Sequence, residues 1–134
     1  MDAKNLGINS KLIHAGDFED EFGSAVVPIY QTSTFSFKNA NHGAQLFKGE
    51  GEGYIYTRLG NPTIESLENK LAALENGFGG IATSSGMSAI TTVYMNLLGQ
   101  GDHIVSTAAV YGPSRGVMET HFSKFGVEYT YLDT

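Results

Sequence analysis

Two tyrosines and an arginine lie close together in the segment GYIYTRLGNPT, residues 53–63. Arg58 is one of only two arginines in the chain, and Tyr54 and Tyr56 shortly precede it. Covering a hydrophobic core does not require this combination, and nothing in the immediate neighbourhood explains it. The residues that follow, Gly60 to Pro62, are explained locally because they are typical of a turn and a helix start.

The segment TSSGMSAI, residues 83–90, is a second candidate because a strand is expected to give way to a helix there. Free backbone N–H groups and the positive end of the helix dipole make such a junction a binding place for anions. Gly86 lacks a side chain, which would let a phosphate approach the backbone closely. The same Ser and Thr residues are also typical of ordinary helix capping, and the motif alone leaves both interpretations open.

A third candidate is Tyr111, in the segment AAVYGPSRG over residues 108–116. It follows an expected parallel strand, and ligands of α/β sheets bind beyond the carboxyl ends of such strands. An aromatic ring there can stack on a planar cofactor, although it can equally pack under its own loop. Arg115, in the first turn of the next expected helix, is interpreted as a surface residue.

Other patterns that could carry chemistry are poorly placed for it. The segment GFGGIA (77–82) follows an expected helix and precedes an expected strand, whereas a dinucleotide fingerprint follows a strand and opens a helix. The four histidines are scattered, and no two are spaced as a metal pair. The chain has no nucleophile elbow of the Gly-x-Ser-x-Gly kind. Neither a metal site nor serine hydrolase chemistry is therefore expected.

The composition is that of a globular domain without a nucleic-acid or membrane partner. Of the 134 residues 41% are hydrophobic and 16% charged, and the net charge is −6, which gives no reason to expect a polyanionic partner. Cysteine is absent, which fits a reducing compartment. The sequence has neither a long apolar run nor a signal-peptide core, so we expect a cytoplasmic protein.

The elements that must position these residues alternate between helix and strand from residue 61 onward. The best helix starts at Asn61, a good N-cap, with Pro62 at its first position, and Gly77 is expected to end it. This order predicts an α/β fold with a mostly parallel sheet and right-handed crossovers. The expected helices cover 39–47, 61–77, 86–101 and 112–126, and the expected strands cover 80–85, 103–107 and 127–132.

The first 45 residues differ, because they show no sustained helical period. Residues 24–37 are rich in β-branched and aromatic residues but contain Pro28, which favours an edge strand or an extended arm. We therefore expect an N-terminal arm over 1–45 that contacts another subunit, followed by an α/β domain over 46–134.

Taken together, the segments resemble the Cys/Met-metabolism family of pyridoxal-phosphate (PLP) enzymes. That resemblance implies PLP as the cofactor and a fold type I transferase architecture, of which residues 46–134 would be the first part of a three-layer domain. Its most specific part is YTRLGNPT followed some residues later by SSGMSAI. The matching segments are HAG (14–16), PIYQTSTF (28–35), GYIYTRLGNPT (53–63), LENKLAALE (67–75), ATSSGMSAI (82–90), GDHIV (101–105), VYG (110–112) and FGVE (125–128).

The resemblance also implies roles for individual residues. The backbone amides of Gly86 and Met87 would bind the cofactor phosphate, with Ser85 beside them as a further cofactor-binding residue. Tyr111 would stack on the pyridine ring and serve as a catalytic residue that assists proton transfer or leaving-group departure.

In the dimers of this family the Tyr-x-Arg segment reaches the phosphate of the neighbouring subunit. Tyr56 and Arg58 match that segment and would bind the cofactor there. We therefore expect a homo-oligomer built from dimers of active sites, as a tetramer. In a lone chain these two side chains would point at nothing.

Several functional groups of the family have no counterpart here, including the Schiff-base lysine. We therefore expect the chain to be an N-terminal fragment of a longer enzyme, inactive by itself. None of the lysines matches the family's lysine motif: Lys4, Lys11, Lys38, Lys48, Lys70 and Lys124.

The resemblance is greatest to the methionine γ-lyases of bacteria and to cystathionine γ-lyase, which implies γ-elimination on methionine or a related amino acid substrate. Those enzymes usually carry Cys directly after Tyr-Gly, whereas this chain has Pro113. The alternative is γ-replacement, as in O-acetylhomoserine sulfhydrylase or cystathionine γ-synthase. An alternative of another class is a truncated, inactive fragment with a binding role only.

Overall fold

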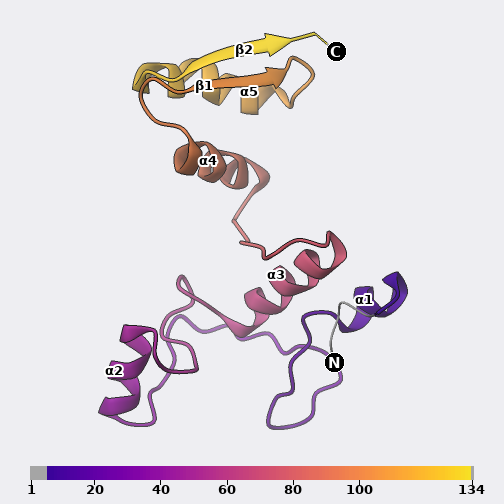
Figure 1. The fold of residues 1–134 in the computed structure, drawn as a ribbon. Helices are drawn as coiled ribbons and strands as arrows, with labels where there is room; N and C mark the ends of the chain where they lie inside the picture. The colour runs from indigo at the N-terminus through magenta and orange to yellow at the C-terminus, as the bar shows by residue number, and fades with distance from the viewer. Residues whose placement is uncertain (1–5, 134) are drawn as a thin grey trace. The chain divides into compact units, whose positions relative to one another are not determined.

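A computed structural model describes residues 6–133 (Figure 1). The chain divides into two compact units, one ending at Ala82 and the other beginning at Thr83, and each is described by itself. Within the residues described, no helix is long and apolar enough to cross a membrane. The expected division into an arm over 1–45 and a domain over 46–134 stays a prediction.

The first unit contains three helices: α1 (Ile8–His14), α2 (Ala40–Lys48) and α3 (Pro62–Leu74). The short helix predicted over 39–47 is confirmed as α2, and Asn39 caps it by accepting a hydrogen bond from the His42 backbone N–H at 2.9 Å. Helix α1 was not expected, because its seven residues are too few to show a helical period.

Helix α3 starts as predicted, with Asn61 as N-cap and Pro62 in its first turn. It ends earlier than the predicted Gly77, since its last residue is Leu74. Asn76 takes a positive φ of 53° one residue before Gly77, and asparagine is one of the few non-glycine residues that adopt this conformation readily. The chain therefore turns out of the helix before it reaches the glycine.

Helices α1 and α3 are joined by two reciprocal hydrogen bonds from lysine side chains. Lys11 Nζ donates to the carbonyl oxygen of Ala73 at 3.1 Å, and Lys70 Nζ donates to that of Ile13 at 3.0 Å. Each lysine thus satisfies a carbonyl in the last turn of the other helix, where a positive charge also favours the helix dipole. Directly after α1, Ala15 is only 1% exposed and Gly16 has a φ of 76°.

The second unit is a small parallel α/β arrangement (Figure 1). Strands β1 (His103–Thr107) and β2 (Glu128–Leu132) pair in parallel, with His103 opposite Glu128. The strands predicted over 103–107 and 127–132 are therefore confirmed, and so is the α/β class. The remaining elements of this unit are α4 (Gly86–Leu97), α5 (Gly112–Thr120) and the 3-10 helix η2 (Phe122–Phe125).

The strand predicted over residues 80–85 is wrong. A strand exists through hydrogen bonds to a neighbouring strand, and no segment within 6–133 pairs with these residues, so the sheet has two strands instead of three. Ile81, which the prediction placed inside a sheet, is 84% exposed.

Two predicted helices are shorter than expected because side chains compete with the backbone ladder. The helix expected over 86–101 ends at Leu97, and the Gly99 N–H donates to the Asp102 carboxylate at 2.7 Å. The helix expected over 112–126 breaks at His121 into α5 and η2. Next to that break the Thr120 hydroxyl donates to the Gly116 carbonyl at 2.6 Å.

The core of the second unit lies between α4, α5 and the strands. Met118, Phe122 and Val127 are buried, and partly buried apolar side chains pack around them. The ring of Tyr94, in α4, meets that of Phe122 edge-on at a centroid distance of 5.5 Å. This cluster joins the C-terminal half of α4 to α5 and η2.

A glycine substitution tests the close packing that follows α1. A Cβ on Gly16 would clash with the carbonyl oxygen of Ser66 and approach the Lys70 backbone nitrogen to 2.9 Å. We expect Gly16→Ala to lower the free energy of unfolding by at least about 2 kcal/mol, from the positive φ and the clash together.

Gly23→Ala is the matched control, because Gly23 also has a positive φ, of 66°, but nothing within 4 Å of its Cβ position. Its free energy of unfolding should fall only by the amount that a positive φ costs an alanine. Equal losses in urea unfolding of the two variants would contradict the close contact between Gly16 and α3.

Candidate functional site

The six predicted site residues fall into two groups, one in each unit. Tyr56 and Arg58 belong to the first unit, between α2 and α3. The other four lie in the second unit, around the N-termini of α4 and α5: Ser85, Gly86, Met87 and Tyr111.

The N-terminus of α4 is capped and otherwise open. The Ser85 hydroxyl accepts from the Ser88 N–H at 3.1 Å, and the Ser85 carbonyl accepts from the Ala89 N–H at 3.0 Å. Among residues 6–133, no protein atom accepts from the N–H groups of Gly86 and Met87. A Cβ on Gly86 would meet nothing within 4 Å. Two free donors at the positive end of a helix, with room in front of them, suit an anion.

Tyr111 leads the neighbouring helix and is open to solvent. It is the N-cap of α5 and is 67% exposed, so it does not pack under its own loop. The Ser114 hydroxyl, in the first turn of α5, lies 3.7 Å from the sulfur of Met87. This contact brings the N-termini of α4 and α5 together, so Tyr111 and the open donors of α4 belong to one region of the unit.

Arg115 is a surface residue, as predicted. Its Nε donates to a Glu119 carboxylate oxygen at 2.7 Å, and its guanidinium lies 4.4 Å from the centroid of the Tyr131 ring. These neighbours raise the pKa of Arg115, chiefly through the hydrogen bond to Glu119.

In the first unit, Tyr56 and Arg58 form a pair. Tyr56 makes an isolated antiparallel bridge with Thr34, and the Arg58 guanidinium lies 5.2 Å from the centroid of the Tyr56 ring. The expectation that these side chains would point at nothing is therefore only partly right. They contact each other, and Arg58 remains exposed.

The segment 53–63 is fixed by Asn61, which does more than cap α3. Asn61 is 3% exposed, and its Oδ1 accepts from the Thr63 N–H at 2.9 Å as a cap. Its amide nitrogen donates to the Tyr30 carbonyl at 2.8 Å and to the Thr57 hydroxyl at 3.1 Å. Thr63 reinforces this junction by donating to the Pro28 carbonyl at 2.7 Å. The matching segments 28–35 and 53–63 are thus joined to each other.

Tyr54, which was not predicted as a site residue, also stabilises this junction. Its hydroxyl donates to a Glu65 carboxylate oxygen at 2.5 Å, and its ring lies 5.3 Å from that of Phe35. Burial, followed by the hydrogen bond to Glu65, raises the pKa of Tyr54 to about 12. The neutral phenol therefore persists at any ordinary pH and holds the start of α3 against the segment before it.

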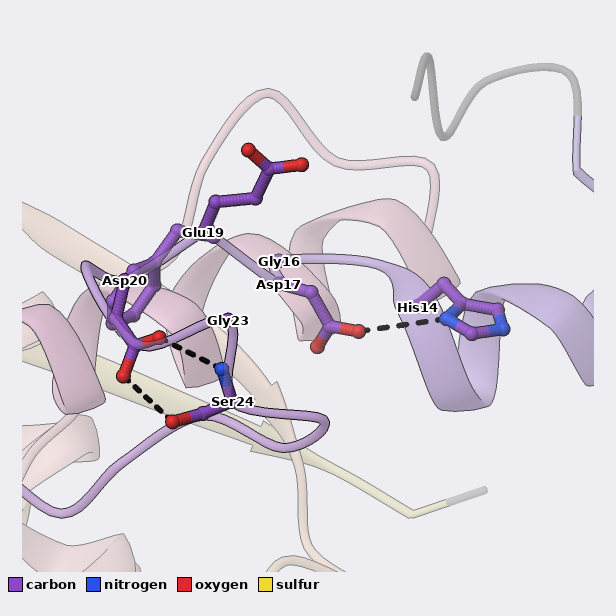
Figure 2. Close-up of a pocket in the computed structure, with 8 residues that line it drawn as sticks. His14, Gly16, Asp17, Glu19, Asp20, Gly23 and Ser24 are labelled. Atoms are coloured by element: carbon purple, nitrogen blue, oxygen red, sulfur yellow. Dashed lines mark hydrogen bonds and ion pairs between the residues drawn. The ribbon is translucent and has the colours of Figure 1, made fainter.

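A separate hollow of about 480 Å³ lies in the first unit and contains none of the six predicted site residues (Figure 2). Two of the carboxylates that line it, those of Asp17 and Asp20, are already engaged. Asp20 accepts from the Ser24 hydroxyl at 2.6 Å and from the Ser24 N–H at 2.8 Å, and these bonds lower its pKa. Asp17 pairs with His14 at 3.6 Å. These interactions fold the loop that follows α1.

Sequence reasoning missed the roles of Asn61 and Ser114 in building the site. For Asn61 a signal existed, because an asparagine side chain can cap a helix with its oxygen and donate hydrogen bonds from a separate NH2 group at the same time. Ser and Asp, the other good N-caps, have no such separate donor group. For Ser114 no pattern in the sequence indicates that its hydroxyl reaches a methionine 27 residues away.

The arrangement in the second unit fits a ligand that has both a phosphate and a planar ring. The open N–H groups of Gly86 and Met87 suit the phosphate, and the exposed ring of Tyr111 suits the planar part. In the first unit, Arg58 offers an exposed guanidinium, a group that binds phosphate oxygens well.

Comparison with known proteins identifies relatives along nearly the whole chain. The family described as Cys/Met metabolism PLP-dependent enzyme matches residues 9–134. L-methionine gamma-lyase from Fusobacterium nucleatum is 48% identical over 134 residues, which are 100% of this chain and 34% of that protein. O-acetyl-L-homoserine sulfhydrylase from Corynebacterium glutamicum is 39% identical over 132 residues, 98% of this chain and 30% of that protein.

The solved structures show the same fold. A Campylobacter jejuni protein whose crystal structure carries N'-pyridoxyl-lysine-5'-monophosphate matches with a TM-score of 0.87 and 32% sequence identity. The match covers 96% of this chain and 32% of that one. This chain therefore spans about a third of the length of the relatives that it matches.

A change at Asn61 tests whether its amide holds the segment. Asp caps helices as well as Asn, but a carboxylate has no N–H for the Tyr30 carbonyl and would face that oxygen directly. We expect Asn61→Asp to lower the free energy of unfolding by about 1–3 kcal/mol, the penalty for an unsatisfied buried group.

Asn39→Asp is the control, because the Asn39 side chain accepts from the His42 N–H in the same way but lies exposed at the start of α2. That variant should unfold like the wild type. If both substitutions had the same effect in urea unfolding, Asn61 would be an ordinary cap.

Proposed function

This chain belongs to the Cys/Met metabolism family of PLP-dependent enzymes, and from that premise we propose that the full-length protein eliminates the γ-substituent of methionine or a related sulfur amino acid. The observation that carries the proposal is the open N-terminus of α4 beside the exposed Tyr111. The 48% identity to an L-methionine gamma-lyase favours this substrate class. The cofactor of the family is pyridoxal phosphate.

In this proposal the start of α4 binds the cofactor phosphate. The N–H groups of Gly86 and Met87 donate to its oxygens, and the helix dipole adds to their attraction for the negative charge. Ser85 fixes the first turn by capping the Ser88 N–H, so the two free donors stay aligned. The empty space at the Cβ position of Gly86 allows the phosphate to reach the backbone.

Tyr111 performs two tasks in this proposal. Its exposed ring stacks on the planar cofactor, and its phenol holds a proton at Oη that can be passed to or from the substrate. The cofactor, when bound, supplies an electron sink that stabilises negative charge on the substrate carbons, so that a γ-substituent can leave. The surrounding protein residues bind and orient the cofactor and exchange protons with the substrate.

Tyr56 and Arg58 complete the site of a neighbouring subunit. The Arg58 guanidinium lies over the Tyr56 ring, and among residues 6–133 no protein atom accepts a hydrogen bond from it, so its donors can reach an anion. We propose a homo-oligomer in which each pair of chains shares two sites, assembled further as a tetramer. A charge-assisted bond from Arg58 to a phosphate oxygen would contribute roughly 1.5–3 kcal/mol.

The lysine that the family uses to bind its cofactor covalently is proposed to lie outside this chain. Lys11 and Lys70 serve as caps for the ends of α3 and α1, which supports a structural role for both. The chain alone is therefore proposed to be inactive.

A second candidate function is γ-replacement, in which a thiol or sulfide takes the place of the departing group. The 39% identity to an O-acetyl-L-homoserine sulfhydrylase favours it. So does Pro113, which stands where the methionine γ-lyases usually carry Cys.

Product analysis of the full-length protein distinguishes the two functions. With methionine and pyridoxal phosphate, γ-elimination yields methanethiol, ammonia and a 2-oxo acid. With O-acetylhomoserine and sulfide, γ-replacement yields homocysteine and acetate. We expect the first set of products to dominate, and homocysteine formation without release of methanethiol would favour the sulfhydrylase instead.

Removal of one guanidinium tests the shared site. We expect Arg58→Ala in the full-length protein to weaken pyridoxal-phosphate binding roughly 10- to 100-fold, because a charge-assisted bond to the phosphate is lost. Folding should change little, since Arg58 is exposed. Equilibrium dialysis against pyridoxal phosphate measures the affinity.

The matched control is Arg115→Ala, which removes the chain's other arginine. That guanidinium is engaged by Glu119 and Tyr131, so cofactor affinity should stay within about twofold of the wild type. Unchanged affinity in Arg58→Ala would overturn the role given to Arg58.

A further inference from the structure

The hydroxyl of Ser114 is buried without an evident reason in stability. Ser114 is 3% exposed, and its Oγ donates to the sulfur of Met87 at 3.7 Å. A hydroxyl taken out of water is unfavourable unless it is well bonded, and a thioether is only a weak acceptor. Alanine also has a higher helix propensity than serine. Packing and propensity alone would therefore favour a methyl group here.

What the hydroxyl does is join two groups of the proposed site. The Ser114 backbone N–H donates to the Tyr111 carbonyl at 2.9 Å, and its side chain holds Met87. Met87 presents its free N–H at the start of α4 while its side chain reaches α5. Two hydrogen bonds through one residue thus connect the exposed tyrosine to the open helix end.

The apolar contacts that join α4 to α5 and η2 include a cluster toward the C-terminal ends of the helices. Tyr94 and Leu98 pack on the buried cluster of Met118 and Phe122 through apolar surface. Such contacts are non-directional, so they bring the helices together without setting the position of one N-terminus against the other. A hydrogen bond at the N-terminal ends supplies the direction that the apolar cluster lacks.

We propose that Ser114 is a positioning residue, whose hydroxyl sets Tyr111 against the phosphate-binding end of α4. This inference rests on the proposed function, because it takes Gly86, Met87 and Tyr111 as cofactor residues. Without the hydroxyl, the Met87 side chain and the first turn of α5 are no longer tied together. The spacing between the aromatic ring and the phosphate donors then varies from molecule to molecule.

The test compares Ser114→Ala with the wild type in the full-length holoenzyme. We expect the dissociation constant for pyridoxal phosphate to rise about threefold, within the range of one neutral hydrogen bond. The circular-dichroism band of the bound cofactor should weaken, because its ring is held less uniformly. The midpoint of thermal unfolding of the apoprotein should not fall below the wild-type value, because packing and helix propensity favour alanine here. A purely structural role of the hydroxyl would lower this midpoint and leave the cofactor band unchanged.

Met87→Leu gives an independent measurement, because it removes the sulfur acceptor but keeps the backbone N–H and nearly the same volume. It should weaken the band like Ser114→Ala, and the double variant should be no worse than either single one. Additive effects would overturn the proposal. The matched control is Ser66→Ala, a buried serine of α3 that is 6% exposed, and it should keep the wild-type band.

Gly86→Val separates failure of this inference from failure of the proposed function. A side chain at the open end of α4 should abolish cofactor binding if the phosphate lies there. If it does so while Ser114→Ala keeps the wild-type band and affinity, Ser114 is not a positioning residue. If Gly86→Val binds pyridoxal phosphate like the wild type, the proposed site itself is wrong, and the inference falls with it.

Discussion

The side chain of Asn61 lies buried where three segments of the first unit meet. One amide group caps α3 and at the same time bonds to Tyr30 and Thr57, which belong to segments on either side of α2. Because a buried amide must satisfy both its oxygen and its nitrogen, the three segments can meet in only a few ways. The position of Tyr56 and Arg58 follows from this constraint, since they lie on the segment that Asn61 holds.

A comparable constraint acts in the second unit, where the starts of two helices are brought together. The apolar cluster around Met118 brings α4 and α5 together, and the bond between Met87 and Ser114 joins their N-terminal ends. Free N–H groups and an exposed aromatic ring result at one end of the unit. The proposed cofactor role is thus a consequence of how two helices start, and each unit supplies a different part of the proposed chemistry.

Local rules predicted much of this from the sequence. Strand β1, the N-cap Asn61 and the start of α4 at Gly86 follow from patterns within a few residues. Non-local effects were missed. The strand expected over 80–85 needs a partner strand, and the bonds from Asn61 to Tyr30 and from Ser114 to Met87 span 31 and 27 residues. The predicted helices extended too far toward the C-terminus, because hydrophobic periodicity carries no information on side chains such as Asp102 that compete for backbone N–H groups.

The most direct test of the account is a crystal structure of the full-length protein with pyridoxal phosphate bound. The account predicts phosphate oxygens within hydrogen-bond distance of the Gly86 and Met87 backbone nitrogens, the cofactor ring against Tyr111, and Arg58 of a neighbouring subunit on the same phosphate. A phosphate bound away from the start of α4 would contradict it.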